Sequence, residues 1–153
     1  MTEVEIKFKK DNQEAIIPAV AYKGTSACFD IIAIETTIIP ANGFAIVPNG
    51  LKVIVPAGWF LEFADRSGNG INKHLKIHQG IIDTGYTGPL AIKVYNMSNK
   101  DQIIEKGKGV CQVKVMKRWD YTVSEATEEE WKEYEQNSIR KSNGFGSSDN
   151  KRS

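Results

Sequence analysis

The sequence predicts an all-β protein of the jelly-roll or barrel-like sandwich class. The β-branched residues Ile, Val and Thr number 18, 10 and 8, whereas Leu and Ala number 4 and 11. β-Branched side chains lose rotamer freedom in a helix and fit a pleated surface. Alternating apolar residues and closely spaced turn residues point to the same class.

Three segments carry an apolar residue at every second position, as a strand with one buried face does. They are 4–8, 51–55 and 90–94. Turn-forming residues separate such runs at 40–43, 48–50, 56–58 and 106–109. Little room is left for helices between strands, which favours a jelly roll or a distorted barrel.

One segment departs from the β pattern. Thr127 and Glu130 have the spacing of a capping box. Trp131 and Tyr134 stand three residues apart, as two residues on one helix face do. A short helix and a solvated acidic turn both stay open here.

Length and charge limit the function classes. The 153 residues suffice for one ordinary domain with a real core. A net charge of +1 gives no global reason to expect nucleic acid or a membrane as partner. We expect neither a secretory leader nor a transmembrane helix, because the first residues are acidic and alternating and the apolar runs are short.

The two cysteines, Cys28 and Cys111, lie far apart in apolar runs. They fit small core residues of a reducing compartment. We therefore expect a cytoplasmic protein, with a nuclear or viral origin left open.

The chain is predicted to have two parts, a β domain over 1–136 and a flexible arm over 137–153. The arm is rich in Ser, Asn, Gly and basic residues, and it buries too little apolar surface to offset its ordering cost. A frayed terminus is one interpretation. The other is a segment ordered by an anionic ligand, because the aromatic residue, glycines and hydroxyls of 144–148 can stack on a base and hold phosphate.

Residues 80–88 form the first candidate site. Two apolar residues enter a glycine-rich turn, and Leu90 starts the next strand, so a hairpin is expected. Asp83 and Tyr86 lie in this turn. Their structural alternative is that Asp83 caps the turn and Tyr86 covers a sheet end.

Three further segments carry candidate polar groups. The glycines of residues 65–70 expose backbone amides beside Arg66, whose planar guanidinium matches phosphate oxygens. The alternative for this segment is a surface turn with an Arg–Asp contact. Gln112 is either a buried amide with a function or an exposed strand position. Asp30 interrupts an apolar run, which is costly unless a cation pairs with it.

His74 and His78 have a spacing that shares one face of a helix or of a strand. The surrounding residues favour a strand, and nearby Glu or Cys ligands are lacking. We assign both histidines structural or surface roles.

Five motifs, taken in order, resemble those of the trimeric dUTP diphosphatases (dUTPases). They are Ala-Cys-Phe-Asp, Arg-Ser-Gly, Gly-Ile-Ile-Asp-x-x-Tyr-x-Gly, Gly-x-x-x-x-Gln and Arg-x-x-x-Gly-Phe-Gly-Ser-Ser. The match runs from about residue 26 to 148. The resemblance implies an all-β jelly roll that assembles into a homotrimer with shared active sites.

The same resemblance implies Mg²⁺-assisted hydrolysis of dUTP to dUMP and pyrophosphate. Asp83 would orient and deprotonate the water that attacks the α-phosphorus. Asp30 would hold Mg²⁺ indirectly, through water, and Gln112 would bind those waters or the phosphates. The phosphate-binding turn would comprise Arg66, Ser67 and Gly68.

Nucleoside selection also follows from the resemblance. Tyr86 would pack under the deoxyribose and exclude a ribose 2′-hydroxyl. Main-chain groups around Gly80, Ile82 and Ala91 would recognise uracil. On the arm, Arg140 would reach the γ-phosphate and Phe145 would stack on uracil. The residues that complete this last motif are Gly146, Ser147 and Ser148.

The chain departs from the family pattern at three positions. Cys28 replaces a usual Gly, and Gly109 stands where a basic residue is common, which removes a possible structural contact. Asp149 falls where the fifth motif normally ends in Gly, and we expect it to turn outward.

Two alternatives to a dUTPase follow from the same residues. A dCTP deaminase shares the fold, but its catalytic Glu corresponds to Lys93, three residues before Asn96. A non-catalytic interaction protein of the same fold is the other, and the sequence leaves a regulatory protein partner open.

Overall fold

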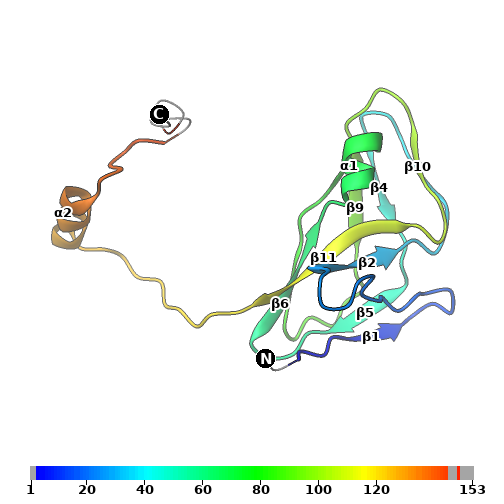
Figure 1. Cartoon of the computed structure of the whole chain (residues 1–153), viewed down its shortest axis with the longest axis horizontal. Helices are drawn as coiled ribbons and strands as arrows, with labels where there is room; N and C mark the ends of the chain where they lie inside the picture. Colours follow the sequence, from blue (N-terminus) through cyan, green and yellow to red (C-terminus); the bar gives the residue numbers. More distant parts are fainter. Residues whose placement is uncertain (1–2, 145–147, 149–153) are drawn as a thin grey trace. The chain divides into compact units, whose positions relative to one another are not determined.

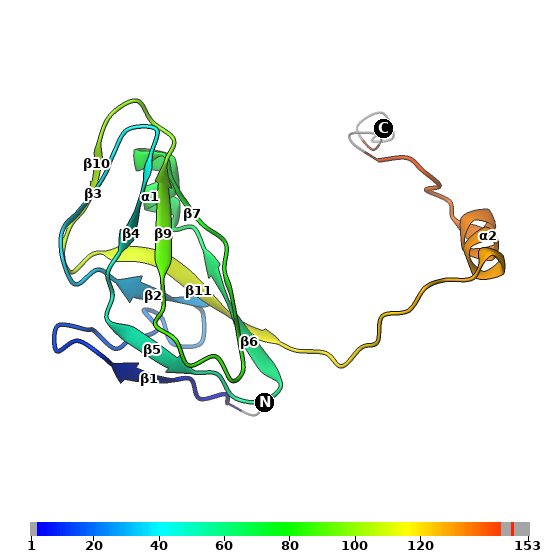
Figure 2. The same cartoon turned by 180° about the vertical axis from the view of Figure 1, so that it is seen from behind.

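The structure is a computed structural model that describes residues 3–144 and residue 148. It divides into two compact units at the boundary between Trp119 and Asp120. Figures 1 and 2 show the elements of both units from opposite sides. The predicted arm over 137–153 belongs to the second unit.

The first unit is built mainly from short strands, as the composition predicts. Its strands are β1 (Lys7–Lys10), β2 (Cys28–Ile32), β3 (Thr37–Ile39), β4 (Phe44–Val47), β5 (Leu51–Ile54), β6 (Trp59–Ala64), β7 (Leu75–Ile77), β8 (Ile81–Asp83), β9 (Ile92–Asn96), β10 (Gln102–Ile104) and β11 (Gly109–Lys117). All strand pairs between them are antiparallel. This confirms the jelly-roll class.

Two larger sheets enclose the core of the first unit. One has the strand order β2-β11-β6-β8 and the other β4-β9-β7, while β1-β5 and β10-β3 form two-stranded ribbons. The most buried large side chains come from most of these sheets. They include Ile31, Ile39, Leu51, Leu61, Ile92 and Ile104. Burial of such a set supplies the main driving force for this fold.

The predicted strand positions at 51–55 and 90–94 are confirmed. Leu51, Val53 and Val55 are all buried, and so are Leu90, Ile92 and Val94. The turn residues also behave as expected, because Gly58 and Gly107 both have a φ of 83°, which L-residues with a side chain rarely adopt. Local periodicity and turn chemistry therefore determine much of this unit.

A helix, α1 (Ser67–Lys73), occupies the segment for which the sequence predicts a turn, either phosphate-binding or simply on the surface. Gly68 and Gly70 each disfavour a helix by about 1 kcal/mol relative to Ala, so helix propensity alone does not predict α1. Tertiary contacts offset that cost, since the Asn69 side chain donates to two carbonyl groups of β11. In both views α1 lies at the end of the first unit opposite to β1 and β5 (Figures 1 and 2).

The prediction of a hairpin over 80–88 is wrong. Strand β8 pairs with β6, whereas the next strand, β9, belongs to the other large sheet. The chain therefore crosses between sheets after Asp83 instead of turning back along β8. Alternation alone does not distinguish a hairpin from such a crossing, because both place turn residues between two strands.

Two expectations about single residues also need correction. Cys111 is buried as predicted, but Cys28 is only half-buried and is no core residue. His74 and His78 do not share a strand: His74 ends α1 with a φ of 55°, and His78 follows β7. Among the described residues, no group of three or more His, Cys, Asp or Glu side chains could hold a metal ion.

The second unit contains the helix α2 (Glu128–Asn137). Thr127 caps it: the Thr127 hydroxyl accepts from the Glu130 N–H, and the Glu130 carboxylate accepts from the Thr127 N–H. The capping box decides between the two open interpretations in favour of the helix. Neither helix of the described chain is long and apolar enough to cross a membrane.

Candidate active site

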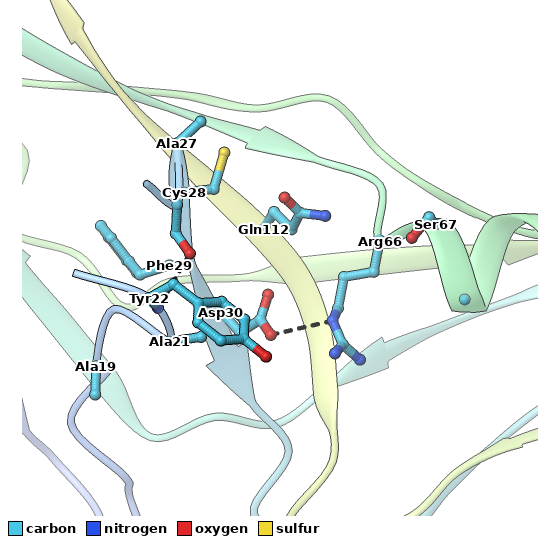
Figure 3. A pocket seen from close by; sticks show the side chains of 12 residues that line it. Ala19, Ala21, Tyr22, Ala27, Cys28, Phe29, Asp30, Arg66, Ser67 and Gln112 are labelled. Carbon is cyan, nitrogen blue, oxygen red and sulfur yellow. Dashed lines mark hydrogen bonds and ion pairs between the residues drawn. The ribbon is translucent and has the colours of Figure 1, made fainter. Parts of the chain in front are cut away.

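A pocket of about 340 Å³ gathers residues from three of the predicted motifs. Asp30 comes from β2, Gln112 from β11, and Arg66 and Ser67 from the start of α1 (Figure 3). Gly68 also lines it. Residues far apart in the sequence thus meet in one hollow, as the resemblance implies for the phosphate-binding part of the site.

Antiparallel pairing brings Asp30 and Gln112 together. Gln112 stands directly opposite Asp30 in the β2–β11 ladder, and opposed residues point to the same face of a sheet. Gln112 is half-buried, so it is neither the buried amide nor the exposed strand residue that the sequence leaves open. A carboxylate and a neutral amide therefore sit side by side at one edge of the pocket.

Arg66 is the cation that Asp30 requires. Its Nε lies 3.2 Å from Asp30 Oδ2, and about a third of each side chain is exposed (Figure 3). Its Nη1 also donates to the Gly109 carbonyl oxygen at 3.1 Å. A guanidinium has five N–H donors, so these two contacts hold it in place while other donors can bind a ligand.

The predicted Arg–Asp contact is formed with Asp30 rather than with the neighbouring Asp65. The Asp65 carboxylate accepts from the Ile77 N–H at 2.6 Å and from Lys76 Nζ at 2.5 Å. Asp65 therefore fixes the strand that follows α1, and Arg66 is left to the pocket.

The sequence interpretation missed Tyr22 as a residue of this pocket. Tyr22 precedes β2 and lines the pocket together with Ser26 and Cys28, which belong to or adjoin the first motif. Tyr22 lies in front of Asp30 in Figure 3, and the Cys28 sulfur lies near Gln112. The position of Cys28 two residues before Asp30 predicts its place in the pocket, because residues two apart on a strand share a face. Tyr22 lies outside β2, so no strand pattern predicts its place.

Cys111 lies behind the pocket on β11. Burial and the nearby Asp30 charge raise the pKa of its thiol from 9.0 to about 12. The thiol therefore stays protonated at neutral pH, and it acts as a small apolar group.

Asp83 ends β8 and Tyr86 lies in the turn that follows, away from this pocket. Asp83 is exposed at the end of the strand, and it does not face the core. Its carbonyl accepts from the Tyr86 N–H at 3.3 Å, and Gly85 has a φ of 86°. The turn therefore presents the Asp83 carboxylate to solvent.

The Tyr86 ring is held across the turn. Its hydroxyl donates to the Pro89 carbonyl at 3.0 Å, and the side chain remains partly exposed. A Cβ on Gly88 would lie 2.3 Å from that hydroxyl oxygen. The absence of a side chain at residue 88 is therefore what allows Tyr86 to lie where it does.

The main-chain groups predicted to recognise uracil surround the same turn. Gly80 precedes β8, and its carbonyl accepts from the Phe63 N–H at 3.0 Å. Ile82 pairs with Leu61 in the β6–β8 ladder. Ala91 is exposed just before β9.

The two halves of the candidate site lie on strands β11 and β8, with β6 between them. On β6, Phe60 stands opposite Asp83 and Ala64 stands opposite Gln112. Four residues of strand and two strand spacings give a Cα separation of roughly 16 Å. One phosphate group cannot contact both side chains within a single copy of the chain.

The arm residues lie in the second unit. Arg140 Nε donates to the Asn143 carbonyl at 2.8 Å, and Ser148 is exposed. Four residues with predictions lie outside the described part of the chain. They are Phe145, Gly146, Ser147 and Asp149, whose predicted outward orientation is therefore not described.

A family model described as dUTPase matches residues 13–149 of this chain. Deoxyuridine 5′-triphosphate nucleotidohydrolase of Saccharomyces cerevisiae is 31% identical over 155 residues, which cover 98% of this chain and all of that protein. The enzyme of the same name from Solanum lycopersicum is 30% identical over 141 residues, or 92% of this chain and 79% of the relative.

The fold comparison agrees with the sequence comparison. The structure of a Staphylococcus bacteriophage 80alpha dUTPase mutant with dUpNHpp has a TM-score of 0.78 and 26% identity. The match covers 94% of this chain and 98% of the phage protein. A second structure, a mutant dUTPase from phage phi11 of S. aureus, has a TM-score of 0.74 at 22% identity and covers 82% of this chain and 98% of that one.

Proposed function

This chain belongs to the dUTPase family, and on that premise we propose that it hydrolyses dUTP to dUMP and pyrophosphate with the help of Mg²⁺. The observation that carries the proposal is the pocket in which Asp30, Arg66 and Gln112 meet. It combines a fixed guanidinium with two oxygen-bearing side chains. This donor and acceptor set suits a chain of phosphates and its counter-ion.

The residues of the pocket fit Mg²⁺ that is held mainly by substrate. Mg²⁺ prefers oxygen ligands and usually binds through one or two carboxylates, waters and substrate phosphates. Asp30 and Gln112 supply such oxygens next to each other. When bound, the ion neutralises charge that develops on the phosphates.

We assign to Asp83 the role of binding the attacking water. Its carboxylate would orient a water molecule in line with the α-phosphorus and accept a proton from it. As the new P–O bond forms, the bond from the α-phosphorus to the bridging oxygen breaks, and pyrophosphate leaves with the electron pair. Since a carboxylate is a weak base, most of the rate would come from alignment and charge neutralisation.

The distance between the two half-sites supports a homotrimer with shared active sites. Asp83 and Gln112 share the outer face of the sheet, where the Glu62–Lys114 ion pair lies between them and two exposed apolar side chains lie beside it. Ile81 is 51% exposed and Met116 is 37% exposed on that face. A neighbouring subunit that covers this face would remove apolar surface from water and bring its own half-site to the pocket.

Substrate selection would come from the turn after β8. The Tyr86 ring, fixed by Pro89 and Gly88, would pack under a deoxyribose and leave no room for a 2′-hydroxyl. Main-chain groups near Gly80, Ile82 and Ala91 would pair with uracil. Misplaced polar groups would reject cytosine, since an unpaired buried donor or acceptor is costly.

The arm would close over the assembled site. We propose that Arg140 reaches the γ-phosphate and that Phe145 stacks on uracil, with Gly146, Ser147 and Ser148 near the phosphates. Ordering of such a segment on binding is a common way to exclude water from chemistry. The cytoplasmic location and a regulatory protein partner stay predictions.

The deaminase alternative finds little support at the decisive position. Lys93 Nζ lies 3.9 Å from the centre of the Phe44 ring, so a cation–π contact occupies the place of that family's carboxylate. Asn96 is buried and donates to the Ile39 and Lys100 carbonyls, which is a structural role.

Pyrophosphate release from dUTP, dCTP, dTTP and UTP, each with Mg²⁺, tests the proposal. We expect turnover of dUTP alone and loss of that turnover when Mg²⁺ is chelated. Asp83→Asn should lower kcat by about 10²- to 10⁴-fold, the contribution of a positioned acid–base group. Ammonia release from dCTP would favour the deaminase, and binding of dUTP without turnover would favour the interaction protein.

A further inference from the structure

Asn69 links the helix that carries Arg66 to the strand that carries Gln112. Its side chain leaves α1 half-buried, and Nδ2 lies 3.1 Å from the Gly109 carbonyl oxygen and 3.3 Å from that of Val110. An amide nitrogen has two N–H donors, so it can serve both carbonyls. The contact therefore ties α1 to the first residues of β11.

The Gly109 carbonyl is shared between Asn69 and Arg66. Arg66 Nη1 donates to the same oxygen at 3.1 Å, while its Nε pairs with Asp30. A carbonyl oxygen has two lone pairs and can accept both bonds. One backbone oxygen thus determines the position of the helix and of the guanidinium together.

Gly109 has no side chain at the point where the guanidinium lies. A Cβ there would be 2.6 Å from Arg66 Cζ and 2.7 Å from Nη1. Such distances are below van der Waals contact, so any other residue at 109 displaces the guanidinium. The loss of a side-chain contact at Gly109 stays a prediction, and its carbonyl makes two contacts that do not depend on a side chain.

We propose that Asn69 is a positioning residue for the binding of the substrate's phosphates. It fixes the Gly109 carbonyl and the first turn of α1, so that the Arg66 guanidinium stays aimed at the pocket. The inference rests on the proposed function for the identity of the ligand. The contacts of Asn69 and Arg66 with the Gly109 carbonyl do not depend on that identity.

Inorganic pyrophosphate with Mg²⁺ is the probe for this role. Asn69→Ala should weaken pyrophosphate binding, measured by calorimetry, by about tenfold, which is the effect of losing about 1.4 kcal/mol. Asn69→Asp should do at least as much, since a carboxylate would face two carbonyl oxygens. The affinity for deoxyuridine should change less than about twofold, because the nucleoside half-site contains neither Asn69 nor Arg66.

Asn72→Ala is the matched control, since Asn72 is an exposed residue of the same helix. Its pyrophosphate affinity should equal that of the parent protein. Gly109→Ala displaces the Arg66 guanidinium without altering Asn69, so it should weaken pyrophosphate binding to the same extent. This variant tests the proposal even if an Asn69 variant folds poorly.

A double-mutant cycle separates positioning from general stability. In an Arg66→Ala background, Asn69→Ala should cost less than about twofold in pyrophosphate affinity, because its effect passes through Arg66. Full additivity of the two losses would overturn the proposal. So would an unchanged affinity in both Asn69 variants.

The ¹⁵N–¹H resonance of Arg66 Nε gives a readout that needs no activity. Once assigned by its loss in Arg66→Ala, it should shift in Asn69→Ala and Gly109→Ala and stay fixed in Asn72→Ala. An unmoved resonance in Asn69→Ala would overturn the positioning role. If it shifts as expected while dUTP is not hydrolysed by the parent protein, the positioning role stands and the proposed function fails.

Discussion

Asp83 and Gln112 face the same side of the four-stranded sheet, but they lie two strands and four residues apart on it. Asp83 pairs with Phe60 on β6, whereas Gln112 pairs with Ala64 on the other side of the same strand. Residues that oppose one another in an antiparallel ladder share a face, and Phe60 and Ala64 share it as well. The residues to which we assign the attacking water and the phosphates therefore lie on one surface, yet too far apart to act together within one copy.

Gly88→Ala is expected to relax discrimination between deoxyribose and ribose. The new Cβ would collide with the Tyr86 hydroxyl, whose oxygen would be 2.3 Å away, and the ring must move. The ratio of kcat/KM for dUTP to that for UTP should fall by about tenfold or more.

The control for Gly88→Ala is Gly70→Ala. At residue 70 a Cβ would meet only the Leu75 carbonyl oxygen, at 3.8 Å. That variant should keep the ratio of the parent protein. An unchanged ratio in Gly88→Ala, with Tyr86 still bonded to Pro89, would contradict the role of the tyrosine.

The Cys111 thiol is expected to make stability fall at alkaline pH. Its pKa is raised to about 12 in the fold against 9.0 for an ordinary thiol, so the folded state holds the proton more tightly. The stabilisation is complete below pH 9 and is lost as pH rises from 9 toward 12, with a limiting slope of about 1.4 kcal/mol per pH unit.

Urea unfolding at several pH values between 8 and 11 measures this slope. Cys111→Ala lowers stability at every pH by leaving a small cavity, but it should remove the thiol's share of the slope. Equal slopes for the parent protein and Cys111→Ala would show that burial does not perturb the thiol.

Thr127→Ala is expected to weaken α2 without affecting catalysis. The change removes the hydroxyl that accepts from the Glu130 N–H and breaks the capping box, at a cost of about 1 kcal/mol. Because no residue of α2 is buried, the loss should appear locally. Faster amide hydrogen exchange over 128–131 is the measurement, and Thr122→Ala, outside the helix, is the control.

The elements that were predictable are those in which local chemistry and packing agree. The alternation of 51–55 and 90–94 identified buried faces. The spacing of Thr127 and Glu130 left a helix and a turn open, and the structure has the helix. Asp30 in an apolar run predicted a cation partner, and Arg66 is that partner.

The remaining elements depend on contacts between distant parts of the chain. The glycines of α1 conceal a helix that Asn69 anchors to β11. The crossing after Asp83 depends on the pairing of β8 with β6, and no short sequence pattern determines that pairing. The lining residue Tyr22 becomes apparent only once the segment before β2 is placed beside the pocket.

Mixed trimers of two inactive variants test the split site most directly. Asp83→Asn and Arg66→Ala, co-expressed with different tags and purified through both, give trimers that contain both variants. If Asp83 and Arg66 of one site come from different subunits, one site in three carries both intact residues, and dUTP turnover should recover to about one third of that of the parent protein. Turnover no higher than that of the separate variants would contradict the account, because it would place both residues of a site in the same subunit or remove them from catalysis.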